Sequence, residues 1–226
     1  MKITILWSLA VLVLLASTVQ AMPCHCFPSR QYDSMDPAAA DPYFLATAQN
    51  SFMAVVFGMD KKDVVLAKQR PATTAEGLWV AHWLAGETGL EPSALLKAKR
   101  VAGSWDGAVK ELTVDVKKLP PSFAKLLAAK TSESGLSRAI VDSLLVGKGL
   151  VVPADLEMVR RAGASDQEAI LAVLIARKGK RKPEQLIRIV KDGKSSWGGL
   201  LAAAGMNGGE MVNEILALAG KGGGRH

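Results

Sequence analysis

The stretch DPYFLATAQNSFMAVVFG, residues 41–58, decides the fold class of this chain. Asp41 is a favoured helix-capping residue, and Pro42 suits the first helical position because the N–H that it lacks has no partner there. Gly58 is a typical helix terminator. The stretch therefore predicts a helix from Asp41 to Gly58, with one side marked by apolar residues at helical spacing: Phe44, Leu45, Ala48, Phe52, Val55 and Val56.

Similar start and stop signals recur along the rest of the chain. They predict further helices over residues 63–69, 74–84, 91–100, 104–112 and 120–130. The chain is 49% hydrophobic, mostly through Ala, Leu and Val, and only 5% aromatic. This composition favours packed helices over a sheet, so we expect an all-α, multi-helix array.

The second half of the chain repeats the pattern of the first half at an offset of 92 positions. Residues of similar chemistry match at this offset: Asn50-Ser51 with Asp142-Ser143, Lys68 with Arg160, and Ser104-Trp105 with Ser196-Trp197. The offset predicts an internal duplication with two similar helical units, residues 41–131 and 132–219. An extended arm, residues 22–40, precedes them in this scheme, and a flexible Gly-rich tail, residues 220–226, follows.

The first 21 residues have the layout of a cleaved signal peptide. Lys2 gives the positive end, and an apolar run from Ile5 to Ala16 follows that is shorter than the roughly 18 residues needed to span a bilayer. Val19 and Ala21 occupy positions −3 and −1 of a cleavage point after Ala21. We therefore expect a periplasmic or secreted protein, and the mature chain has no second long apolar run that would predict a transmembrane anchor.

Cys24-His25-Cys26, in the arm, is the sharpest chemical feature of the sequence. Two thiolates around an imidazole form a soft donor set suited to Cu(I) or Zn(II), which makes copper or zinc the candidate metal. A further ligand is needed, and His82, His226 or the α-amino group would supply it. The alternatives are a local disulfide, a disulfide to a partner, or no role.

Trp79 and Trp83 lie four positions apart, so they share one face of the predicted helix, with His82 beside them. One interpretation is an aromatic platform that binds a glycan or a peptide. The other is a structural one, because large aromatic residues at helical spacing most often pack into a core.

Arg177, Lys178, Lys180, Arg181 and Lys182 form the densest basic run, which we name the basic loop (residues 177–182). The whole chain has a formal net charge of +7. In an exported protein this charge favours an envelope protein or an anionic envelope polymer as the partner, whereas nucleic acid is not expected. A solvated surface loop is the alternative.

The stretch Gly193-Lys-Ser-Ser-Trp-Gly198 resembles the short helical Gly-x-Ser-Trp-Gly-type repeats of uncharacterised exported bacterial proteins. The resemblance covers about a quarter of the mature chain and implies no activity. The first half departs from it, because Asp106 stands where Gly198 is found in the second half.

No nucleophile elbow, zinc-protease motif or phosphate-binding loop is present in the sequence. The expected function is thus a non-enzymatic helical scaffold or binding protein that engages its ligand through the groove between the two units. The alternatives are metal binding or trafficking through the Cys-His-Cys arm, and a redox or disulfide-tethered envelope component.

Overall fold

The computed structural model describes residues 27–221, which form twelve α-helices, one short 3-10 helix and no strand. The all-α prediction is therefore confirmed for this part of the chain, while the predicted signal peptide lies outside it. None of the described helices combines the length and apolar content needed to cross a bilayer. The helices are α1 (Asp41–Phe57), α2 (Lys61–Lys68), α3 (Ala75–Thr88), α4 (Pro92–Ala102), α5 (Trp105–Glu111), the 3-10 helix Val116–Lys118, α6 (Pro121–Ala128), α7 (Glu133–Gly147), α8 (Pro153–Arg161), α9 (Asp166–Lys178), α10 (Pro183–Lys191), α11 (Trp197–Ala203) and α12 (Gly208–Lys221).

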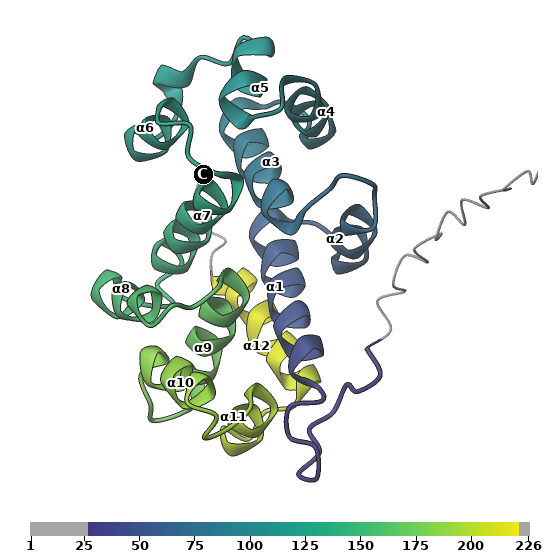
Figure 1. The fold of residues 1–226 in the computed structure, drawn as a ribbon, viewed down its shortest axis with the longest axis vertical. Helices are drawn as coiled ribbons and strands as arrows, with labels where there is room; N and C mark the ends of the chain where they lie inside the picture. The colour runs from purple at the N-terminus through teal and green to yellow at the C-terminus, as the bar shows by residue number, and fades with distance from the viewer. Residues whose placement is uncertain (1–26, 222–226) are drawn as a thin grey trace, which may run out of the picture.

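Two enclosed helices form the centre of the molecule. Every residue from Thr47 to Ala54 of α1 and from Ala169 to Ile175 of α9 is buried. Helix α1 packs against α2, α9, α11 and α12, and α9 also packs against α10. Figure 1 shows α1 and α3 following one another along the long axis, with α12 beside α1. Because two turns of α1 are buried, a polar side chain there is unfavourable unless it is paired, and the Oγ of Ser51 has no partner among the described residues.

The helices of the two halves occur in the same order and at nearly constant spacing. Helices α7, α8 and α11 begin 92 residues after α1, α2 and α5, and helices α9 and α10 begin 91 residues after α3 and α4. The packing recurs as well: α1 lies against α9 and α3 against α7, while α12 lies against α1 and α6 against α7. The match ends with the last helix of each half. Helix α12 is longer than α6, and it begins earlier within the second half than α6 does within the first.

Asp41 connects the start of the first half to the end of the second. Ala40, not Asp41, is the N-cap residue of α1. The carboxylate of Asp41 accepts hydrogen bonds from the backbone N–H groups of Trp197, at 3.0 Å, and Gly198, at 2.8 Å. These are the first two residues of α11. The predicted capping of α1 by Asp41 is thus wrong, because this carboxylate satisfies the free N–H groups of a helix 156 residues further along the chain.

Glu133, the first residue of α7, makes the corresponding connection from the start of the second half to α5 of the first half. Its carboxylate accepts a hydrogen bond from the indole N–H of Trp105, at 2.8 Å, and forms an ion pair with Lys99 at 2.7 Å. Its position lies 92 residues after Asp41, and Trp105 lies 92 residues before Trp197. An acid at the start of each half therefore holds the Ser-Trp helix of the other half.

Gly198 of α11 lies against the arm, which the structure describes over residues 27–40. A β-carbon at Gly198 would lie 3.0 Å from Cδ2 of Tyr32, 3.1 Å from Cε2 of Phe44 and 3.3 Å from the carbonyl oxygen of Pro37. These separations are shorter than ordinary van der Waals contact. Only glycine leaves the arm and α1 in their observed positions against α11.

We predict that Gly198→Ala destabilises the protein by about 1–3 kcal/mol, because the methyl group overpacks the junction between the arm, α1 and α11. For a chain of this size the melting temperature falls by a few degrees. Gly86→Ala is the matched control, since Gly86 lies exposed in α3 and its β-carbon would meet nothing within 4 Å. That change should raise the melting temperature slightly, as Ala favours a helix over Gly. Equal melting temperatures for the two variants would contradict the prediction.

Candidate functional site

A cavity of about 640 Å³ lies beside α1, where the arm and α2 meet α9. Three of its lining residues carry a positive charge, Arg30, Lys61 and Lys68, and none is an aspartate or glutamate. We name it the cationic cavity. Its full lining comprises Phe27, Arg30, Pro42, Tyr43, Leu45, Ala46, Thr47, Asn50, Lys61, Val65, Lys68 and Gln167.

Lys68, at the end of α2, is held by neutral amide groups. Its Nζ lies 3.0 Å from Oδ1 of Asn50 and 3.4 Å from Oε1 of Gln49. The same Gln49 oxygen accepts a hydrogen bond from Nε2 of Gln167, at 2.9 Å, which connects the site to α9. No carboxylate of the described residues lies within ion-pair distance of this ammonium group. Burial lowers the pKa of Lys68, and the more distant charge of Glu76 only partly opposes the shift.

Lys61 adds a second cation at an unfavourable place. It is the first residue of α2, where the helix dipole favours negative charge. Burial lowers the pKa of Lys61 as well. The helix dipole therefore disfavours Lys61, whereas it favours Lys68 in the last turn of α2, and both lysines line the same cavity.

Helix α1 supplies an unusual set of buried polar residues to this site. Thr47 and Gln49 are each 4% exposed and Asn50 is 8% exposed. Together with Ser51 they make up four of the six buried polar side chains of the described residues. Burying a polar group is unfavourable unless it is paired, so this concentration on one helix makes the wall of the cavity a candidate site.

The corresponding position in the second half is fully neutralised. Arg160 lies 92 residues after Lys68, and its Nη2 lies 2.6 Å from Oδ1 of Asp142 and 2.7 Å from Oδ1 of Asp166. Asp142 in turn lies 92 residues after Asn50. The second half thus surrounds its cation with two carboxylates, whereas the first half gives Lys68 amide oxygens and leaves its charge uncompensated.

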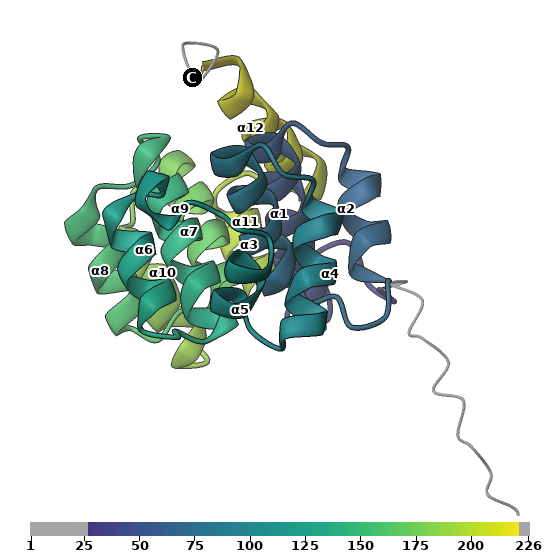
Figure 2. The same cartoon turned by 90° about the horizontal axis from the view of Figure 1, so that it is seen from above.

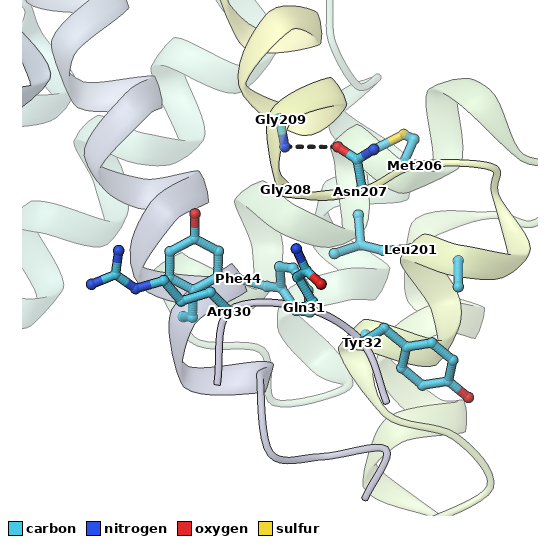
Figure 3. A pocket seen from close by; sticks show the side chains of 12 residues that line it. Arg30, Gln31, Tyr32, Phe44, Leu201, Met206, Asn207, Gly208 and Gly209 are labelled. Carbon is cyan, nitrogen blue, oxygen red and sulfur yellow. Dashed lines mark hydrogen bonds between the residues drawn. The ribbon is translucent and has the colours of Figure 1, made fainter. Parts of the chain in front are cut away.

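A second hollow, of about 620 Å³, adjoins the cationic cavity on the other side of Arg30 and Tyr43. Figure 3 shows Arg30, Gln31 and Tyr32 of the arm along one side of it and Leu201, Met206 and Asn207 on the other. The guanidinium carbon of Arg30 lies 6.0 Å from the centre of the Tyr43 ring, within the range of a cation–π contact. Arg30 therefore separates two adjoining hollows, and the arm forms part of the wall of both.

The predicted aromatic platform is not a single exposed surface. Trp79 is 0% exposed and packs against Phe52 and Phe57, and its indole N–H has no hydrogen-bond partner among the described residues. Trp83 is half-buried against Phe123, with ring centres 4.1 Å apart. The burial of Trp79 favours the structural interpretation of this pair.

His82 is half-buried beside this aromatic cluster. It stacks on Phe57, with ring centres 5.6 Å apart, and burial lowers its pKa. It therefore packs as a largely apolar ring against α1.

All five basic residues of the basic loop are exposed. Lys178 forms an ion pair with Glu214 at 3.1 Å, and Lys182 forms one with Asp155 at 3.5 Å. Arg177, Lys180 and Arg181 form no ion pair with any described residue.

The predicted metal site at Cys24, His25 and Cys26 lies outside the described residues. Among the residues whose side chains are described, no three His, Cys, Asp or Glu side chains converge where they would share a metal ion.

Sequence reasoning missed the cationic cavity, although one signal of it is present. The run Thr47, Gln49, Asn50 and Ser51 interrupts the apolar pattern in the middle of the first predicted helix. A polar run at the centre of an otherwise apolar helix indicates a buried site. Comparisons with known proteins add no further guide, because no protein-family profile, curated protein or solved structure matches the chain.

We predict that the free energy of unfolding rises as the pH increases toward the ordinary lysine pKa of 10.5. Because burial lowers the pKa of Lys68 in the folded protein, the unfolded chain binds more protons than the folded one between the two pKa values, and raising the pH then favours the folded state. The rise should be smaller in Lys68→Met, which has no such proton to release.

Denaturant unfolding over a series of alkaline pH values measures this difference. Lys117→Met is the control for the loss of one exposed lysine from the 3-10 helix. Parallel curves for the native protein and Lys68→Met would contradict the assignment of a half-buried charge without an ion-pair partner to Lys68.

Proposed function

We propose that this protein is a non-enzymatic binding protein that holds a small organic anion in the cationic cavity. The observation that carries the proposal is the lining of the cavity, where three cations meet without a carboxylate. Partial burial of Lys61 and Lys68 without an ion-pair partner is unfavourable, and an anionic ligand relieves this by pairing with them. The ammonium group of Lys68, positioned by Asn50 and Gln49, is the anchor for the negative group of the ligand.

The remaining walls of the cavity favour a ligand that is only partly polar. Phe27 and Tyr43 pack edge to face with ring centres 5.8 Å apart, and Leu45 and Val65 add aliphatic surface. A volume of about 640 Å³ falls in the range of roughly 300–1,000 Å³ that is typical of small-molecule sites. These features favour a carboxylate or phosphate monoester with an aromatic or aliphatic body.

We also propose that the helical body arose by internal duplication of a five- to six-helix unit. The recurring order, spacing and packing of the helices support this, as do the matched pairs Asp41–Trp197 and Glu133–Trp105. In this view the cationic cavity belongs to the groove between the units, since Gln167 of the second unit lines it beside residues of the first. The first unit retained a binding site, and the second closed its own with Asp142 and Asp166.

The place of action that we propose is outside the cytoplasm, in the periplasm or beyond it. The leader-like residues 1–21 of the sequence support this part of the proposal. An exported binding protein for small organic anions would act as a carrier or scavenger in that compartment.

We predict that benzoate and hexanoate bind the protein, while benzylamine, the cationic counterpart of benzoate, does not. Lys68→Met should weaken binding of both anions by roughly tenfold or more, because a hydrogen bond to a charged group contributes about 1.5–3 kcal/mol. Ligand-observed NMR and isothermal titration calorimetry measure the affinities, with inorganic phosphate as a probe for the negative group alone.

Lys117→Met, a surface change that removes the same charge, should leave the affinities unchanged. Circular dichroism of Lys68→Met checks that the helices remain. If benzylamine bound as well as benzoate, or if Lys68→Met bound both anions as tightly as the native protein, the proposal would be wrong.

A further inference from the structure

A different surface of the molecule combines positive charge with exposed apolar residues. A hollow of about 550 Å³ lies between the basic loop and the turn from α7 to α8. Its basic side carries Arg177, Lys180 and Arg181, and its apolar side carries Val151 and Val152. We name it the basic hollow. Figure 2 shows α8 and α10, which flank it, on the opposite side of the molecule from α2. Residues of α2 line the cationic cavity.

The charge of the basic hollow is not needed by the fold. Ion pairs with Glu214 and Asp155 use Lys178 and Lys182, which leaves the three other basic side chains without an ion-pair partner among the described residues. The loop between α3 and α4, at the same place in the first half, contains Glu91 and no basic residue, and Glu87 precedes it in the last turn of α3. The same helix connection is therefore formed without the positive charge.

Val152 distinguishes this surface from a purely electrostatic one. It is 58% exposed at the N-cap of α8, where its neighbours Val151 and Pro153 also line the hollow. A soluble polyanion gains no binding energy from an exposed aliphatic side chain beside the cations. A bilayer surface uses both, because basic side chains meet lipid phosphates while apolar ones enter the boundary of the acyl chains.

We propose that the basic hollow docks the protein on the surface of an anionic lipid bilayer. Arg177, Lys180 and Arg181 contact lipid phosphates, and Val152 enters the region below the headgroups. The contact is peripheral and reversible, and it leaves the cationic cavity on the far side open to solvent. The proposal does not depend on the ligand of that cavity.

Co-sedimentation of the protein with vesicles tests this proposal. The protein should sediment with vesicles of phosphatidylcholine mixed with phosphatidylglycerol and remain in solution with phosphatidylcholine alone. Each basic residue near an anionic surface contributes about fivefold to partitioning, so the triple variant Arg177→Glu, Lys180→Glu, Arg181→Glu should lower partitioning by at least about 100-fold. The control Lys117→Glu, Lys118→Glu, Lys125→Glu changes the net charge equally, on exposed residues of the 3-10 helix and α6, and should have a much smaller effect.

A second pair of variants separates the bilayer from other anions. Val152→Ser should lower partitioning by about fivefold, because the exposed part of the side chain is then not buried in the bilayer. Val101→Ser, at a position that is 68% exposed on α4, should not change it.

Three outcomes would overturn the proposal. One is no sedimentation with the anionic vesicles, and another is sedimentation that the triple basic-loop variant leaves unchanged. The third is equal sedimentation of Val152→Ser and the native protein together with full displacement by inorganic polyphosphate, which would assign the surface to a charged polymer. Melting curves of every variant confirm that a loss of binding is not a loss of folding.

Discussion

Two turns of α1, Thr47 to Ala54, are enclosed by protein on every side, and the rest of the site depends on this constraint. A helix in that position would be most stable if all its side chains were apolar, yet four of the eight are polar. Gln49 and Asn50 meet this constraint by accepting hydrogen bonds from Lys68, and Gln49 also accepts one from Gln167. The lysine is thereby held inside a wall of the cavity with no counter-ion. The same polar stretch of α1 therefore determines the buried hydrogen bonds of the helix and holds the positive charge at the site.

The two halves hold the cation at their equivalent positions, Lys68 and Arg160, in different ways. Arg160 with Asp142 and Asp166 is a closed ion-pair cluster, which fixes α8 to α7 and α9 but offers nothing to a ligand. Lys68 with its amide partners fixes α2 to α1 more weakly and keeps its charge available. Two differences separate the structural cluster from the candidate binding site: Asp142 stands against Asn50, and Asp166, the first residue of α9, stands against Ala75, the first residue of α3.

Local signals predicted much of the fold, and contacts between distant segments account for what was missed. The Ser-Trp helices begin where the sequence indicates, because Ser104 and Ser196 accept the N–H groups of Gly107 and Gly199 three residues later. The capping role of Asp41 was wrong because its partner lies in α11. The cationic cavity combines Arg30, Lys68 and Gln167, whose meeting no sequence spacing indicates. The offset of 92 matched Lys68 with Arg160, but it gave no sign that one is neutralised and the other is not.

The contact between Asp41 and α11 also sets the order in which the chain can complete its fold. The residues of α1 are synthesised early, but three of the helices that pack against it, α9, α11 and α12, are made after residue 165. Until then its enclosed polar turns and much of its apolar surface have no cover. Long sequence separation between contacts slows folding and links distant segments into one cooperative step. The two halves, although built alike, are therefore not independent folding units, and the first reaches its final structure only when the last helices have been synthesised.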